Sequence, residues 1–116
     1  MALAEARFQR APAGDRKARR ALRVAALHDL TGAKAASLTW LRVSLREGPR
    51  LSAPRFLDSV RVLARNRIEI EAPRLEAWLA RLTPAERETP LARTLADELA
   101  QHQARDAERR SGYLFH

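Results

Sequence analysis

The sequence predicts an all-α protein, a small bundle of four to five helices. Apolar residues recur at intervals of three and four along most of the chain, which is the spacing of one face of a helix. Hydrophobic residues make up 46% of the chain but aromatic residues only 5%, so Ala, Leu and Val must fill the core. Ala and Leu favour helices. The 116 residues suffice for one domain with a single core.

The positive charge is concentrated in the first part of the chain. Residues 1–70 contain 15 Lys+Arg and 6 Asp+Glu, a net charge of +9, whereas residues 71–116 contain 7 and 8, a net charge of −1. Such a field attracts a polyanion to one end of a molecule and leaves the other end for protein contacts. We therefore predict three regions: a flexible basic arm over 1–14, a basic helical region over 15–70 that is the candidate nucleic-acid-binding half, and a helical oligomerisation or partner-binding half over 71–116.

The first well-patterned helix is expected to run from Asp15 to about Leu30. The segment 11–14 contains Pro and Gly and breaks helices, and Asp15 after it is a good N-cap. Within the helix, four arginines at i, i+3, i+4 and i+7 form a stripe on one face. Like charges at this spacing repel one another, so the stripe either contacts phosphates or is a solvated face. It consists of Arg16, Arg19, Arg20 and Arg23.

A second helix is expected over about residues 33–46, after a short turn containing Gly32. This spacing is typical of a helix-turn-helix, in which the second helix reads base edges. The candidate nucleic-acid-binding residues of this helix are Lys34 near its start and Arg42 and Arg46 near its end. Short glycine turns also join helices that bind no nucleic acid, so the motif is a hypothesis.

The same helix has two apolar faces. Three leucines form one stripe, and Trp40 and Val43 fall on the opposite side. Either the helix is central to the fold, or Trp40 and Val43 contact another subunit. Trp40 is therefore a candidate partner-binding residue.

A third helix is expected to begin at Pro54, because proline is tolerated in a first helical turn. Its core face is Phe56, Leu57, Val60, Leu63 and Ala64. Asn66 can end the helix, and residues 67–71 alternate strictly between polar and apolar. An isolated strand would have nothing to pair with, so we predict an extended linker here, or else a strand paired across a subunit boundary.

Beyond residue 70 the prolines mark helix starts. Pro73 is expected to open one helix, the sequence Thr83–Glu86 is a capping box, and Pro90 restarts the final helix. From 101 to 110 no apolar residue is larger than alanine, so we expect this end to project into solvent or to bundle through polar contacts.

The last residues add an apolar tail after Gly112. Tyr113, Leu114 and Phe115 can fold back on the core of the chain or dock in a groove of a partner protein. These three are candidate partner-binding residues.

The sequence contains no signature of catalysis. Cysteine is absent, the three histidines have no metal-ligand spacing, and the four glycines lie too far apart for a phosphate-binding loop. We predict a non-enzymatic protein without a metal or cofactor. No apolar stretch approaches the roughly 20 residues that span a bilayer, so we expect a cytoplasmic protein with no membrane partner.

Two classes of function are consistent with these observations. The first is a helical DNA-binding adaptor that forms a homo-oligomer or recruits a protein partner through its C-terminal tail. Its order of parts is similar to that of phage small terminase subunits, which implies DNA packaging, although no residue motif of that family is present; transcriptional regulators use the same order. The second is a helical protein–protein interaction adaptor that binds no nucleic acid.

Overall fold

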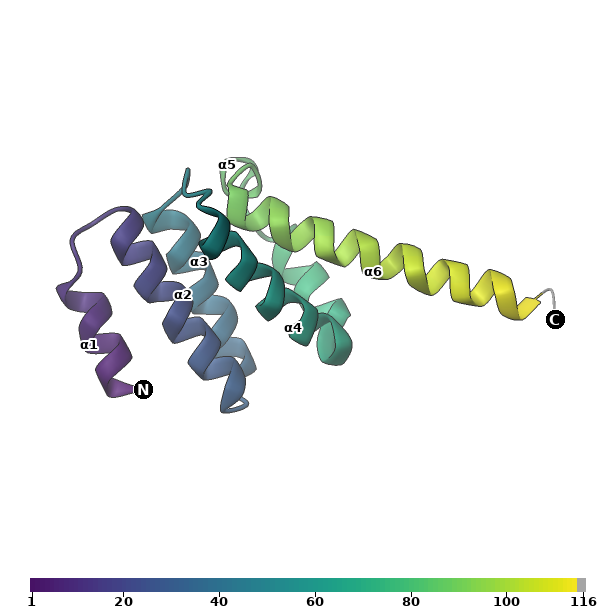
Figure 1. The fold of residues 1–116 in the computed structure, drawn as a ribbon, viewed down its shortest axis with the longest axis horizontal. Coiled ribbons are helices and arrows are strands. Elements are labelled where there is room, and N and C mark those ends of the chain that lie inside the picture. The colour runs from purple at the N-terminus through teal and green to yellow at the C-terminus, as the bar shows by residue number, and fades with distance from the viewer. Residues whose placement is uncertain (115–116) are drawn as a thin grey trace.

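The computed structural model describes residues 1–114, and this part of the chain forms six helices and no strand (Figure 1). The helices are α1 (Ala2–Arg10), α2 (Asp15–Leu30), α3 (Lys34–Glu47), α4 (Pro54–Ala80), α5 (Pro84–Arg87) and α6 (Pro90–Leu114). The predicted all-α helical bundle is confirmed.

Helices α2 and α3 form an antiparallel hairpin. The Ser37 hydroxyl donates a hydrogen bond to the Ala25 carbonyl, and the Ser44 hydroxyl donates one to the Ala18 carbonyl, each at 2.7 Å. The donors advance along α3 from Ser37 to Ser44, whereas their acceptors go back along α2 from Ala25 to Ala18 over the same number of residues. The two helices are therefore antiparallel. The two alanines are fully buried and allow this close approach. A helix-turn-helix needs a crossing of about 90–120°, so the hypothesised motif is not formed.

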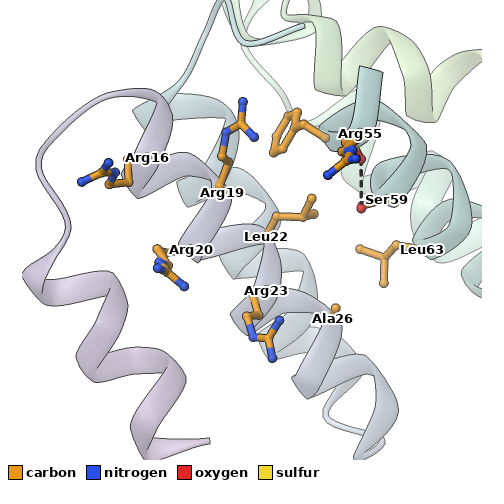
Figure 2. Close-up of a pocket in the computed structure, with 10 residues that line it drawn as sticks. Arg16, Arg19, Arg20, Leu22, Arg23, Ala26, Arg55, Ser59 and Leu63 are labelled. Atoms are coloured by element: carbon orange, nitrogen blue, oxygen red, sulfur yellow. Dashed lines mark hydrogen bonds between the residues drawn. The ribbon is translucent and has the colours of Figure 1, made fainter. Parts of the chain in front are cut away.

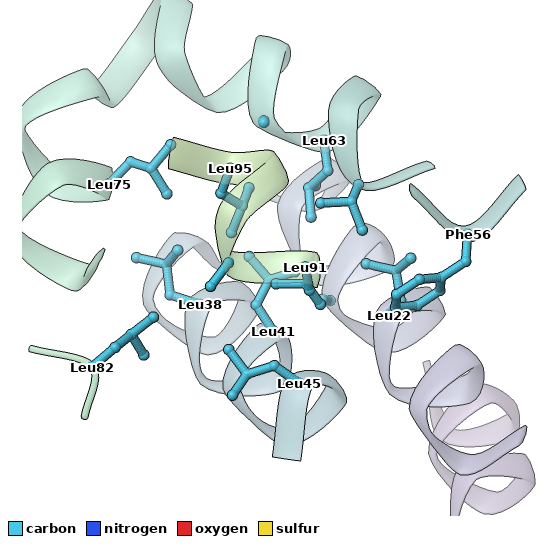
Figure 3. Packing of buried hydrophobic residues seen from close by; sticks show 14 of the residues in the cluster. Leu22, Leu38, Leu41, Leu45, Phe56, Leu63, Leu75, Leu82, Leu91 and Leu95 are labelled. Atoms are coloured by element: carbon cyan, nitrogen blue, oxygen red, sulfur yellow. The ribbon is translucent and has the colours of Figure 1, made fainter. Parts of the chain in front are cut away.

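The main core lies where α2, α3, α4 and α6 meet (Figure 3). It is almost entirely aliphatic, as the composition predicted, and its best-buried side chains come from both halves of the sequence. They include Leu41, Leu45, Val60, Leu75, Leu91 and Leu95. Because α6 contributes to this core, the two halves that differ in charge share one hydrophobic interior.

The predicted flexible arm is wrong for residues 2–10, which form α1. Ala4 and Phe8 are buried in a second, smaller cluster with Ala21 and Val24 of α2. The rings of Phe8 and Trp40 meet edge to face, with their centroids 4.9 Å apart. Two apolar residues four positions apart are enough to dock a short helix on the outer face of the hairpin.

This contact also explains the second apolar face of α3. Trp40 is half-buried and packs against both clusters, and Val43 packs against the smaller one. The interpretation of α3 as a central helix is confirmed. Trp40 packs against both clusters within the chain but stays partly exposed, and its contact with a partner remains a prediction.

The predicted linker over 67–71 is wrong for residues 67–70, which continue the first helical segment of α4 and include the buried Arg67 and Ile68. The helical backbone is interrupted at Glu71, whose φ of −144° and ψ of 45° are not helical. Pro73 lies two residues later and cannot donate the hydrogen bond that a straight helix needs at this point. Pro73 thus lies in the first turn of a second helical segment, which ends at Ala80, and the prediction that Pro73 opens a helix is confirmed.

The ends of the other helices agree with most of the sequence signals. Pro54 occupies the first turn of α4, and the Thr83–Glu86 capping box forms with both hydrogen bonds present. Asp15 is the first residue of α2 rather than its cap, which is Gly14 with a φ of 105°.

The last turns of α6 extend away from the bundle, as expected from their polarity (Figure 1). The last buried residue of α6 is Leu99. Of the predicted tail, Tyr113 and Leu114 belong to the last turn of α6, whereas Phe115 lies outside the described residues.

Candidate nucleic-acid interface

A groove of about 560 Å³ lies between α2 and the start of α4 (Figure 2). Buried aliphatic and aromatic side chains, such as Leu22 and Phe56, line it together with five arginines. We call it the arginine groove, and its arginines are Arg16, Arg19, Arg20 and Arg23 of α2 and Arg55 of α4. The four candidate residues predicted from the α2 stripe are thus brought together.

The sequence of α2 explains why these arginines share one surface. Small residues such as Ala18, Ala21 and Ala25 make up much of the face that packs against the hairpin partner and α1. The arginine stripe falls on the remaining face, because its spacing follows the same helical period.

The start of α4 contributes positive charge of its own. Pro54 begins the helix and Arg55 follows immediately. The N-cap residue, Ala53, has no side chain that could accept a hydrogen bond from the first backbone amides. The N-terminus of a helix carries a partial positive charge, so this end of the groove combines a guanidinium group with that charge.

Two arginines of α1 extend the basic surface. Arg7 and Arg10 line a smaller hollow of about 240 Å³ between α1 and α2, together with Arg16 and Arg20 of the arginine groove. Arg7, Arg10 and Arg55 were not among the residues predicted for this site. Arg7 and Arg10 fall in the region predicted to be a flexible basic arm, whereas the structure places them on a helix. The available signal for α1 was the pair of apolar positions Ala4 and Phe8.

Seven arginines therefore form one surface without acidic partners. Within residues 1–114, none of them lies within 4.0 Å of a carboxylate oxygen. They are Arg7, Arg10, Arg16, Arg19, Arg20, Arg23 and Arg55.

The other predicted candidates lie elsewhere and are engaged in ion pairs. The Lys34 ammonium is 2.8 Å from Asp29, and Arg42 and Arg46 both contact Glu86, at 2.8 and 2.9 Å. The structure does not bring Lys34, Arg42 or Arg46 to the arginine groove.

Glu86 is buried and accepts hydrogen bonds from both Arg42 and Arg46. The hydrogen bond from Arg42 is the main reason why the pKa of Glu86 is well below its ordinary value, and the Thr83 amide and Arg46 add to the effect against the opposing cost of burial. The same hydrogen bond raises the pKa of Arg42. Glu86 therefore remains ionised at neutral pH and joins α3 to α5.

The structure contains no metal-type cluster in the part of the chain that it describes: no three His, Cys, Asp or Glu side chains come together. His28 instead lies 3.7 Å from Glu5 of α1. None of the helices within 1–114 is both long enough and apolar enough to cross a lipid bilayer.

The arginine groove and the adjoining arginines of α1 are the candidate functional site of this protein, on the grounds of geometry and charge. Comparisons with protein-family models, with curated proteins and with solved structures found no match.

Proposed function

We propose that this protein is a non-enzymatic nucleic-acid-binding protein, with DNA as its expected ligand, and that it holds phosphates at the arginine groove and at the adjoining arginines of α1. The observation that carries this proposal is the set of seven arginines on one surface without acidic partners among residues 1–114. Within residues 1–114, other arginines such as Arg50 and Arg81 also lack an acid within 4.0 Å, but they do not line this surface, and Arg42 and Arg67 are paired with acids.

Phosphate is the anion that suits this surface. A guanidinium group donates two parallel hydrogen bonds to phosphate oxygens, and clustered guanidinium groups repel one another until an anion neutralises them. A nucleic acid supplies phosphates at regular intervals along its backbone and releases counterions when arginines replace them.

The groove favours binding that is independent of sequence. Its one aromatic residue, Phe56, is buried and cannot stack on a base. The predicted recognition helix, α3, is part of the hairpin and packs on both sides, so it is not free to enter a major groove. Contacts to phosphates position a protein on DNA without reading its sequence.

The projecting end of α6 is the proposed site of oligomerisation or of partner binding. Most residues between Ala100 and Gly112 are exposed, and this segment extends away from the bundle (Figure 1). A homo-oligomer formed there, or a partner recruited there, would leave the arginine groove free. DNA packaging of the phage type and transcriptional regulation are the two settings proposed for such an adaptor.

The test is binding to a labelled duplex of about 20 base pairs over a salt series. If all seven arginines each meet a phosphate, the slope of log K against log salt should be about −6. The variant Arg19→Gln/Arg23→Gln should reduce the slope by about 2 and weaken binding at least about tenfold. The matched control is Arg81→Gln/Arg87→Gln, which removes the same charge from two exposed positions outside both the arginine groove and the projecting end of α6.

Three results would count against the proposal. They are an absence of binding at low salt, binding that does not respond to salt, and equal losses in the groove variant and in the control variant. An absence of binding to both duplex and single-stranded DNA, with retained binding to a protein, would favour the alternative of a protein–protein adaptor.

A further inference from the structure

The groove between α2 and α4 continues beyond its arginines. A second hollow, of about 400 Å³, shares Ala26, Ser59 and Leu63 with the arginine groove. It ends between Leu30 of α2 and Val62 of α4, whose exposed fractions are 79% and 56%. The two hollows form one valley that is basic at one end and apolar at the other.

Nucleic acid does not explain the apolar end of this valley. Leu30 and Val62 line the same hollow and are largely exposed. Contact with phosphates does not stabilise such aliphatic side chains, whereas burial under another apolar surface does. The two acids that line this end are already paired, Asp29 with Lys34 and Arg67, and Asp58 with Arg61. This end therefore presents Leu30 and Val62 to a ligand, beside the polar Ser59 and Asn66 and the exposed Asp58–Arg61 ion pair.

The shape of the valley suits a helix. Its walls are two helices that run in the same direction, since both hollows use earlier residues of α2 with earlier residues of α4. From Arg16 to Leu30 the valley is about 21 Å long, which is the length of a helix of about 14 residues. An amphipathic helix that lies in a hydrophobic groove is a common mode of protein recognition.

We propose that the valley between α2 and α4 binds an acidic amphipathic helix of a partner protein, and that this helix and nucleic acid exclude each other. The acidic residues of the helix would lie on the arginines, and its apolar residues would cover Leu30 and Val62. Charge complementarity selects this occupant: a neutral helix would leave the arginines uncompensated, and a nucleic acid would leave the apolar end exposed. A flat anionic membrane would not follow a recess between two helices.

The probe is a labelled synthetic helix of about 14 residues, with Glu in one half and a leucine stripe in the other. It is made in both orders along the chain, and a peptide of the same composition in scrambled order is the control. The protein variant is Leu30→Ser/Val62→Ser, which changes no charge and alters two side chains that are largely exposed. Circular dichroism melting checks that the variant folds.

A patterned peptide should bind more tightly than the scrambled one and should displace the DNA duplex. The serine variant should lose about tenfold in affinity for the peptide, because the apolar contact is removed. Its affinity for DNA should stay within about twofold, since the arginines are unchanged.

The inference is overturned if the scrambled peptide binds as well as the patterned ones, if the serine variant binds the peptide unchanged, or if peptide and DNA bind together. Binding to anionic vesicles that depends on Leu30 and Val62, without peptide binding, would assign the apolar end to a membrane and also overturns it. Peptide binding by a protein that binds no DNA would refute the proposed function and the mutual exclusion, and would leave the helix-binding site standing.

Discussion

Asp29, near the end of α2, holds the guanidinium group of Arg67 inside the protein. Arg67 is only 1% exposed, its Nη1 lies 3.1 Å from Asp29 Oδ1, and its Nη2 donates a hydrogen bond to the Lys34 carbonyl at 2.6 Å. The Lys34 ammonium reaches the same carboxylate. The turn between α2 and α3 is thereby fastened to α4 by a buried cation.

Removal of this carboxylate should strongly destabilise the fold. Asp29→Ala leaves the buried Arg67 without a counter-ion and should lower the free energy of unfolding by about 3–5 kcal/mol. The double variant Asp29→Ala/Arg67→Met removes the unpaired charge as well and should recover much of that loss. Urea denaturation measures both variants, and equal losses in the two would show that the ion pair is not the cause.

Glu86 should make stability depend on acid pH. Its pKa is lowered from the ordinary value of 4.5, chiefly by Arg42, so its ionised form stabilises the folded state above that value. This contribution is lost progressively as the pH falls from about 5 toward the lower, folded pKa. Urea midpoints of the wild type and Glu86→Gln should therefore differ most near neutral pH and converge in acid. Glu88→Gln, at an exposed ion pair with Arg93, is the control and should differ little at any pH.

Repulsion among the arginines of the groove should destabilise the folded state at low salt. Arg19→Gln/Arg23→Gln removes three like-charge pairs at i, i+3 and i, i+4 along α2, each worth a few tenths of a kcal/mol, and should stabilise the fold by about 1 kcal/mol. High salt screens these charges and should abolish the difference. Thermal melts at the two ionic strengths test this, and an equal or lower melting temperature of the variant at low salt would contradict it.

The buried ring of Phe8 should be required for α1 to pack against the α2–α3 hairpin. Phe8→Ala removes a ring that is buried against Trp40 and should lower the free energy of unfolding by about 3 kcal/mol. It should also shift the Trp40 fluorescence and open the chain to trypsin after Arg10. Leu3→Ala, at an exposed position of the same helix, should change neither readout. An unchanged cleavage pattern in the Phe8 variant would mean that α1 stays docked without the ring.

Signals that act over a few residues were sufficient to predict much of this fold. The capping box at Thr83–Glu86 and the proline at the start of α4 depend on neighbouring residues only, and both form as expected. The stripe on α2 follows from the period of the helix, and its four arginines do line one groove. Short or ambiguous patterns failed, because residues 2–10 and 67–70 are helical and contribute buried side chains to the rest of the molecule.

The free arginines could not be identified in this way, because pairing depends on residues far apart in the chain. Arg42 and Glu86 are separated by 44 positions, and Arg65 and Glu98 by 33. A count of charges shows an excess in the first 70 residues but does not say which arginines have acids beside them.

The sequence by itself determined the helical class of this protein, the capping box of α5, the proline at the start of α4 and the uneven distribution of charge, since each depends on composition or on contacts within a turn or two. Only the tertiary structure decided that α2 and α3 form a hairpin and that α1 packs against it. It also decided that Arg42 and Arg46 form ion pairs with Glu86, whereas the arginines of the groove have no acidic partner within residues 1–114. Those outcomes depend on which surfaces meet when distant segments pack, and burial and ion pairing are properties of that packing.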